Sequence, residues 1–381
     1  MVLYGESHGA FLIQFGFSYS LADPSLFVYK KDLGYLSYFL GLEVAYTNSG
    51  LFLSQTKYAH DILVRAGLVD SKPAATPLAT TKRFTSHGTL LNDPTFYRSL
   101  VGALQYLMIT CPDISYAVNQ VMYFLHAPTT DHFQAVKRII RYVKGTLVYG
   151  LSFHHASKPS LLGYSDADWA RCIETRRSTY GYSIFLGGNL ISWSAKKQPT
   201  VARSSCESEY RALANTAAEI VWITHLLHEL YVLPSERPTI LCDNKSTIFL
   251  SQNPISIKRS KHIDINYHFV CELVSSGKLY TKFVPTTLQL AEIFTKSIPR
   301  SLFESFRSKL HVGPPPVHLK GGGGRMMMVY VVMMMTMNSN EGDDKRKDDD
   351  SKKMVRVNED DDDDYVMLMI KTMIDNDDDD D

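Results

Sequence analysis

The stretch YSDADWA, residues 164 to 170, follows an apolar pair. It forms the end of a predicted strand, where Asp166 supplies a carboxylate. Three later acids stand where other elements can bring them to the same place. They are Glu209 in an amphipathic helical stretch, Asp243 at the end of TILCD, and Glu292 in QLAEIFTK. Four carboxylates repel one another, so a fold gathers them only around a cation, and hard oxygen ligands suit Mg²⁺ or Mn²⁺. The hypothesis is a two-metal nuclease centre.

The residues around this stretch predict a mixed sheet with helices. Short apolar runs bounded by turn residues predict strands, and apolar residues at helical spacing predict helices. The expected order is three strands (161–169, 180–188 and 189–197), a helix over 205–230, the strand TILCD, the helices KSTIFLSQ and HIDINYHFVCELVSS, the strand KLYTKFVP, and a last helix starting near Thr287. The second and third strands are expected to form a hairpin through Gly187-Gly188-Asn189.

The residues before this region predict strands and then helices. Asn48-Ser49-Gly50 is typical of a hairpin turn, and residues 56–68 predict a helix ending at Gly67. Residues 73–91, rich in Pro, Thr, Ser and Gly, predict a linker. Three apolar stripes at helical spacing predict three helices within 94–145.

The zero net charge hides an uneven distribution. Residues 341–381 hold 18 acidic and 7 basic residues, which leaves 22 acidic and 33 basic residues in the other 340. A basic body with an acidic tail favours a polyanionic partner such as nucleic acid, although ordinary solvated lysines also explain a surplus of this size. The glycine, methionine and aspartate runs after residue 312 have low complexity, so we expect a disordered tail over 313–381.

The five cysteines are scattered and form no CxxC pair, which indicates a reducing compartment and neither a disulfide framework nor a zinc site. The first residues, MVLYGESHGAF, lack the layout of a signal peptide. The longest apolar run, residues 326–337, has 12 residues and is too short to span a bilayer as a helix. We therefore expect an intracellular protein without a membrane partner, with cytoplasm and nucleus both left open.

Many ordered motifs lie between about residues 10 and 312: YFLGLEV, LSQTKYAHDIL, YRSLVGALQYL, CPDISYAV, YVKGT, GYSDADWA, RRSTYGY, ISWSAKKQ, VARSSCESEYRAL, CDNKSTI, KHIDINYHF and QLAEIFTK. Together they resemble the end of a copia-type retrotransposon Pol polyprotein, a reverse transcriptase remnant followed by ribonuclease H. The resemblance implies an α/β fold (α+β over the whole chain) whose ribonuclease H-like domain has a five-stranded mixed sheet with flanking helices. The implied segments are a truncated reverse transcriptase palm (1–92), a helical connection or thumb-like region (93–158), the ribonuclease H-like domain (159–312) and the tail (313–381).

The resemblance also implies the roles of the four acids. Asp166, Glu209 and Asp243 match the family's metal ligands, and Glu292 stands where the family usually has aspartate. Two divalent ions about 4 Å apart would clamp one phosphodiester, one activating water and the other stabilising the leaving oxygen. The implied substrate is the RNA strand of an RNA–DNA hybrid, recognised partly through its 2′-hydroxyls. The extra methylene of Glu292 predicts weakened hydrolysis, because Mg²⁺ tolerates little error in its octahedral shell.

Basic residues precede the helix that carries Glu209. Lys196, Lys197 and Arg203, with Ser204 at the helix start, suit contacts to phosphate, and a solvated loop explains them equally well. Ser204 and Glu207 have capping-box spacing, so Glu207 is expected to start the helix rather than bind metal. Asp168 is expected to be a neighbour of the centre or a turn residue.

The polymerase half departs from the family pattern. The family has a Tyr-x-Asp-Asp hairpin where Lys31 here runs straight into Asp32, no Asp-Asp pair occurs before residue 343, and the upstream palm segment is also missing. We therefore expect no DNA synthesis.

Two alternatives to the nuclease stay open. One is a non-catalytic transposon remnant that at most binds nucleic acid, alone or with an intact retrotransposon polyprotein. The other is a DNA-joining integrase, which is disfavoured because its acids run in the order aspartate, aspartate, glutamate.

Overall fold

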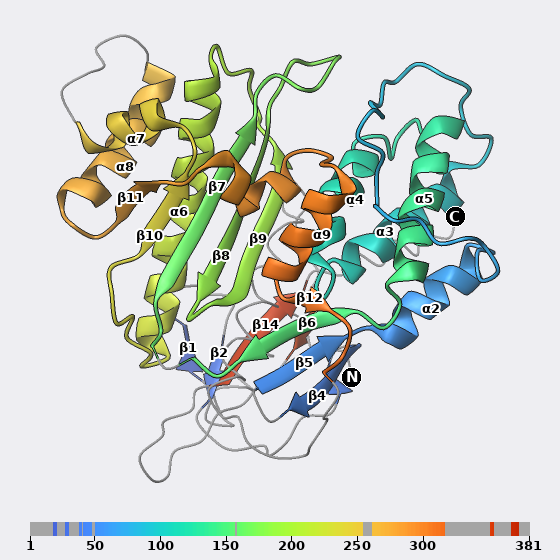
Figure 1. Cartoon of the computed structure of the whole chain (residues 1–381), viewed down its shortest axis with the longest axis horizontal. Helices are drawn as coiled ribbons and strands as arrows, with labels where there is room; N and C mark the ends of the chain where they lie inside the picture. Colours follow the sequence, from blue (N-terminus) through green and yellow to red (C-terminus); the bar gives the residue numbers. More distant parts are fainter. Residues whose placement is uncertain are drawn as a thin grey trace, which may run out of the picture.

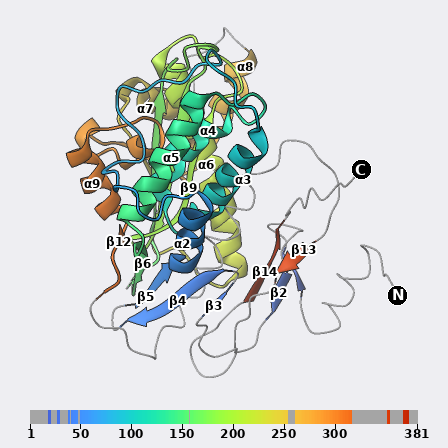
Figure 2. The same cartoon turned by 90° about the vertical axis from the view of Figure 1, so that its right-hand side faces the viewer.

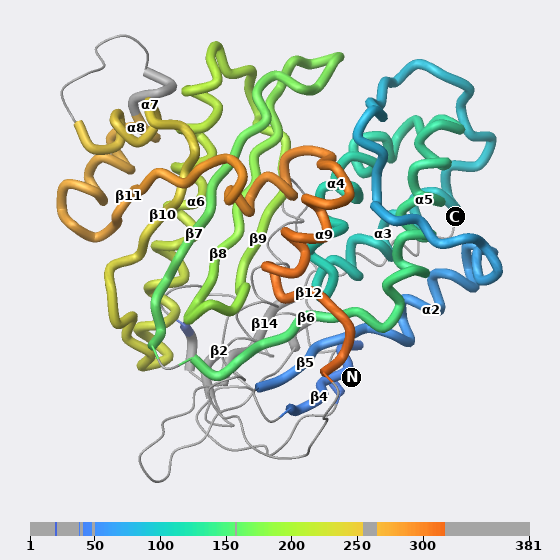
Figure 3. Tube along the Cα trace, in the orientation of Figure 1, coloured from blue at the N-terminus to red at the C-terminus, as the bar shows by residue number. Residues whose placement is uncertain are grey.

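In the computed structural model, the described residues are 18–20, 27–29, 38–39, 41–47, 50–156, 158–253, 261–316, 351–353 and 367–372. Figure 3 traces the larger part of them in colour.

The central feature is a five-stranded mixed sheet in the order β11-β10-β7-β8-β9. Its strands are β7 (Leu161–Asp168), β8 (Thr179–Leu186), β9 (Asn189–Lys197), β10 (Thr239–Cys242) and β11 (Tyr280–Phe283). β7, β8 and β9 pair antiparallel, whereas β10 runs parallel to β7 and β11 parallel to β10. This confirms the expected sheet and the α/β fold class. Gly187 and Gly188 both have positive φ, so the expected hairpin turn is also present.

Helices cover both faces of this sheet (Figure 1). α6 (Ser205–Glu229) lies against β7, where a Cβ on Gly163 would come within 2.9 Å of Ile220. α7 (Lys245–Gln252) and α8 (Lys261–Ser275) pack beside α6. The short 3-10 helix η3 (Leu290–Phe294) crosses β7 and β8 on the opposite face. Its approach requires Gly181, since a Cβ there would lie 2.6 Å from the Cβ of Phe294.

The stretch after β11 differs from the prediction of a helix starting near Thr287. It forms two 3-10 turns, η2 (Thr286–Leu288) and η3, and the helix α9 (Arg300–Lys309) begins only after Pro299. The reason is Gln289, a fully buried residue with extended backbone. Its side-chain Nε2 donates to the carbonyl oxygen of Ser165 at 2.9 Å, which ties the chain to β7 and interrupts a regular helix.

A second sheet has the order β12-β6-β5-β4-β3. It contains β3 (Tyr38–Phe39), β4 (Leu42–Thr47), β5 (Gly50–Ser54), β6 (Gly150–His154) and β12 (Val312–Gly313). The predicted hairpin is confirmed, because β4 pairs antiparallel with β5 up to Thr47 and Gly50. This sheet joins strands from the beginning, middle and end of the chain and so crosses the proposed boundaries at 92 and 158.

The predicted helices before residue 146 are present (Figure 2). They are α2 (Thr56–Arg65), α3 (Pro94–Leu107), the 3-10 turn η1 (Pro112–Ile114), α4 (Ser115–Met122) and α5 (Thr130–Gly145). α2 ends at Arg65, and Gly67, two residues later, has positive φ. Asp93 caps α3 by accepting from the amide of Thr95 at 2.8 Å. α4 packs against β9, which joins this helical region to the central sheet. Among the described helices, none combines the length and apolarity needed to cross a membrane.

A third sheet, β1-β2-β14-β13, was not predicted. It pairs β1 (Ser18–Tyr19) and β2 (Phe27–Tyr29) with β13 (Ser351–Lys353) and β14 (Met367–Thr372). Apart from β13, β14 and residues 313–316, the tail over 313–381 for which we expected disorder lies outside the described residues. The junction of Lys31 and Asp32 also lies outside it.

Candidate metal centre

Four separate elements deliver the four predicted acids to one end of the central sheet. Asp166 lies near the end of β7, Glu209 in the second turn of α6, Asp243 directly after β10, and Glu292 in η3. Asp166, Glu209 and Glu292 are 5%, 7% and 5% exposed, and Asp243 is half-buried. Burial of three carboxylates in one region needs compensation by nearby positive charge or hydrogen bonds.

The acids are close enough for their charges to interact. Ligand atoms of Glu209, Cys242 and Asp243 lie within 4.8 Å of one another. Asp166 interacts electrostatically with Asp243 and Glu292, and Glu209 interacts with Asp166 and Asp243. The expected convergence is therefore present, and the metal-binding role of each acid stays a prediction.

Crowding and burial shift the acids toward their neutral forms. Burial, together with the charges of Asp243 and Glu292, raises the pKa of Asp166 to about 7, against the opposing effects of Thr295 and Lys296. Burial and the charges of Asp166 and Asp243 raise the pKa of Glu209 well above its usual value. A cation bound among these carboxylates would favour their ionised forms and lower their pKa values.

The donor set fits a hard divalent cation. Carboxylate oxygens are the ligands that Mg²⁺ and Mn²⁺ prefer. The sulfur of Cys242 lies 4.0 Å from Oε2 of Glu209, and sequence reasoning did not single this residue out. Burial and the charge of Glu209 raise the pKa of the Cys242 thiol well above its ordinary value, so the thiolate that binds soft metals is disfavoured. Asp166, Glu209, Asp243 and Glu292 would hold the ions.

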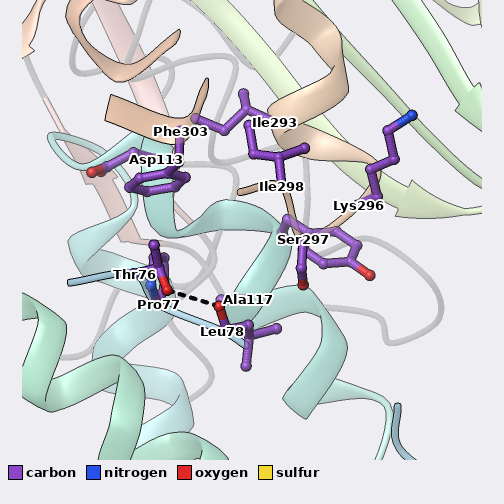
Figure 4. A pocket seen from close by; sticks show the side chains of 11 residues that line it. Thr76, Pro77, Leu78, Asp113, Ala117, Ile293, Lys296, Ser297, Ile298 and Phe303 are labelled. Atoms are coloured by element: carbon purple, nitrogen blue, oxygen red, sulfur yellow. Dashed lines mark hydrogen bonds between the residues drawn. The ribbon is translucent and has the colours of Figure 1, made fainter. Parts of the chain in front are cut away.

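A lysine that the sequence analysis did not select stands among the acids. Nζ of Lys296 lies 2.5 Å from Oε1 of Glu292, and Lys296 also interacts with Asp166 and Asp168. In Figure 4 its ammonium points away from the apolar residues that line the cavity between α4 and η3. Lys296 follows Glu292 by four residues within QLAEIFTK, and this spacing was the available signal.

Two threonines and a glutamine fix the acids in place. The hydroxyl of Thr295 donates to Oδ2 of Asp166, and that of Thr286 donates to Oδ2 of Asp243 at 2.8 Å. Gln289 anchors the same segment to β7, as described above. The residues after β11 therefore hold carboxylates that come from two different strands.

The predicted nucleic-acid-binding residues fall into two groups. Lys196 and Lys197 end β9, and the ammonium of Lys197 lies 3.8 Å from the ring centre of Tyr123. Arg203 is exposed beside the start of α6. Ser204 is the N-cap of α6, and its Oγ accepts from the amide of Glu207 at 3.1 Å. The binding of nucleic acid by these four residues stays a prediction.

The neighbouring acids have structural partners. Glu207 accepts from the amide of Arg203 at 2.8 Å and pairs with Arg211 at 2.6 Å, in agreement with its expected place at the helix start. Asp168 pairs with Arg171 at 2.9 Å, just beyond the centre.

Comparisons with known proteins point to one family, although no family model matches the chain. The chain is similar to the retrovirus-related Pol polyprotein from transposon RE2 of Arabidopsis thaliana, with 47% identity over 73% of this chain and 19% of that protein. An uncharacterized mitochondrial protein of Arabidopsis thaliana is 56% identical over 50% of this chain and 80% of its own length. The chain thus spans about a fifth of the transposon polyprotein.

A solved structure of the N-terminal ribonuclease H domain of a Mycobacterium tuberculosis protein covers 39% of this chain and 97% of its own chain, with 12% identity. Its TM-score of 0.29 is too low to support a conclusion.

Proposed function

Because the chain belongs to the Pol polyproteins of copia-type transposons, we propose that its five-stranded domain hydrolyses the RNA strand of RNA–DNA hybrids. The family contributes a ribonuclease H-type domain at this place in the polyprotein. The observation that supports catalysis is the convergence of four acids, three of them buried, from four elements of the fold.

The chain's own residues have distinct parts in this proposal. Asp166, Glu209 and Asp243 hold the charge of the divalent ions, and Thr286 and Thr295 keep two of these carboxylates oriented. When bound, two Mg²⁺ or Mn²⁺ ions supply water activation and stabilisation of the leaving oxygen. Lys296 contributes a fixed positive charge beside the reacting phosphate. Glu292 on η3 completes the acid set, and its charge interacts with that of Asp166.

A hybrid cleavage assay tests this function. Purified protein with Mg²⁺ and a hybrid labelled on its RNA strand should release RNA fragments, and Asp166→Asn should reduce the rate by at least about a hundredfold. Asp70→Asn removes one exposed carboxylate after α2 and serves as the charge-matched control. Equal rates for the Asp166 variant and the control would overturn the proposal.

The polymerase remnant is proposed to be inactive. The family's Asp-Asp pair is missing between residues 30 and 40, and polymerisation needs carboxylates for its own metal ions. A primed template with deoxynucleotides should show no incorporation, and extension of the primer would refute this part. Association with an intact retrotransposon polyprotein, which would supply DNA synthesis in trans, is part of the same proposal.

A further inference from the structure

A pocket next to the acids lies between the helical region and the central sheet. Its lining comes from the linker, from α4 and the residues after it, from the connection between β7 and β8, and from the end of β9. The pocket, with the solvent at its mouth, has a volume of about 480 Å³. Two parts of the chain that are far apart in sequence thus form one concave surface.

Four cationic side chains line this pocket: Lys82, Arg83, Arg171 and Lys197. No carboxylate is among its lining residues. Two of these cations form ion pairs with acids outside the lining. Lys82 pairs with Asp131 at 2.8 Å, and Arg171 pairs with Asp168. Within the part of the chain that the structure describes, Arg83 forms no ion pair. The lining therefore carries four positive charges and no carboxylate, and the charges of Arg83 and Arg171 both act on Asp168 outside it.

Aromatic side chains make the base of the pocket rigid. The Tyr123 hydroxyl accepts from the amide of Lys197 at 2.8 Å, while the Lys197 ammonium lies over its ring. Phe124 stacks on the buried ring of His132 with ring centres 3.8 Å apart, and Phe84 meets both rings edge-on or tilted. These contacts fix Lys197 on Tyr123 and hold the rings of Phe84 and Phe124 in place.

We propose that this basic pocket binds a backbone phosphate of one nucleic-acid strand that passes through the metal centre. The inference rests on the proposed function, to which it adds a second contact. The pocket adjoins the metal centre, and this favours a nucleic acid over a small anion as the ligand of the pocket. Asp168, the partner of Arg171, follows Asp166 by two residues, which is about 7 Å along a strand. A polymer with one phosphate every few ångströms can occupy both places at once.

The first test measures hybrid binding in EDTA, where the strand stays intact. Lys82→Gln/Arg83→Gln should weaken binding about three- to tenfold and lower the slope of log K against log salt by about one to two. Lys57→Gln/Lys278→Gln removes the same charge from exposed positions on α2 and before β11. Equal losses for both double variants would show general electrostatic attraction and would overturn the proposal.

The second test uses Cys172, a half-buried lining residue whose sulfur lies 3.5 Å from Nζ of Lys197. Bound hybrid should slow alkylation of Cys172 at least about fivefold, and Cys172→Ser identifies the labelled thiol. Unchanged labelling at saturating hybrid, or equal protection by millimolar inorganic phosphate alone, would overturn the proposal. If hybrid protects Cys172 but is not cleaved, the proposed nuclease activity is contradicted and the proposed binding in the pocket is supported. If hybrid is cleaved but does not protect Cys172, the nuclease activity is supported and the binding in the pocket is contradicted.

Discussion

Glu292 stands where the copia-type pattern has aspartate, and its carboxylate meets Lys296 at 2.5 Å. The longer side chain places the charge farther from its backbone than aspartate would, and Mg²⁺ requires a near-ideal shell. Glu292→Asp should therefore raise the rate of hybrid cleavage, by about two- to tenfold, at saturating Mg²⁺. Glu304→Gln, at an acid that pairs with Arg300 on α9, is a control for unrelated charge changes. An unchanged or lower rate in the aspartate variant would contradict the assignment of Glu292 to the centre.

For individual residues, the sequence predicted the four acids but not the residues that hold their carboxylates in place. Asp166 and Asp243 stand at the ends of predicted strands and Glu209 lies within a predicted helix, and the resemblance to the copia-type family distinguished these acids from their neighbours. The two threonines act through contacts between segments more than 40 residues apart, and such contacts leave no local pattern. Lys296 lies four residues after its partner Glu292, a local spacing that the sequence analysis did not use. Ser204 was predicted to have capping-box spacing and to contact phosphate; its hydroxyl caps α6, and the phosphate contact stays a prediction.

At the scale of elements, η3 depends on a close approach to the central sheet. Gly181 is paired with Asp166 across β8 and β7, and a Cβ there would overlap Phe294 and crowd Thr295. Gly181→Ala should move η3 away from the sheet and weaken the Thr295–Asp166 contact. We expect about 1 to 3 kcal/mol of destabilisation by overpacking, with a loss of Mn²⁺ affinity.

Gly102→Ala is the matched control for this variant. Gly102 lies in α3, and a Cβ there would meet no other atom within 4 Å, so alanine should leave stability unchanged or raise it slightly. Chemical denaturation gives the stability and a Mn²⁺ titration gives the affinity. Equal behaviour of the two variants would show that η3 does not need the glycine.

Local patterns predicted the type of most elements in the described part. Apolar alternation and glycine turns predicted β7, β8 and β9, and apolar stripes predicted α3 to α6. The stretch after β11 was predicted to be a regular helix, but the tie from Gln289 to Ser165 is a tertiary contact that overrides local helical spacing.

Across the whole molecule, one buried acid links the helical region to α9. The hydroxyl of Tyr142 on α5 donates to Asp113 in η1, and Arg307 on α9 donates to the same hydroxyl at 3.0 Å. Burial raises the pKa of Asp113, against the opposing hydrogen bond from Tyr142 and the charge of Arg307. The folded state therefore holds this proton more tightly than the unfolded state does.

This raised pKa predicts a pH dependence of stability. The contribution of protonated Asp113 is fully present below its ordinary pKa and is lost as pH rises through its raised pKa in the folded state. The melting temperature of the native protein should fall relative to that of Asp113→Asn as pH rises from about 4 to about 7. Thermal unfolding of both proteins across this range checks the expectation, and parallel curves would contradict it.

The order of the sheets shows what a linear pattern cannot predict. β6 (Gly150–His154) and β12 (Val312–Gly313) join the amino-terminal hairpin in one sheet, and neither strand was predicted from the sequence. The pairing of β2 with β14 likewise depends on partners at opposite ends of the chain. The basic pocket arises in the same way, because its cations belong to segments about 90 residues apart and only the fold brings them together.

Diffraction from crystals soaked in Mn²⁺ tests the central claim most directly. The account predicts two anomalous peaks about 4 Å apart at the end of β7, bounded by oxygens of Asp166, Glu209 and Asp243, with Glu292 adjacent. Mn²⁺ absent from these acids at saturating concentration, or bound only elsewhere on the molecule, would contradict it.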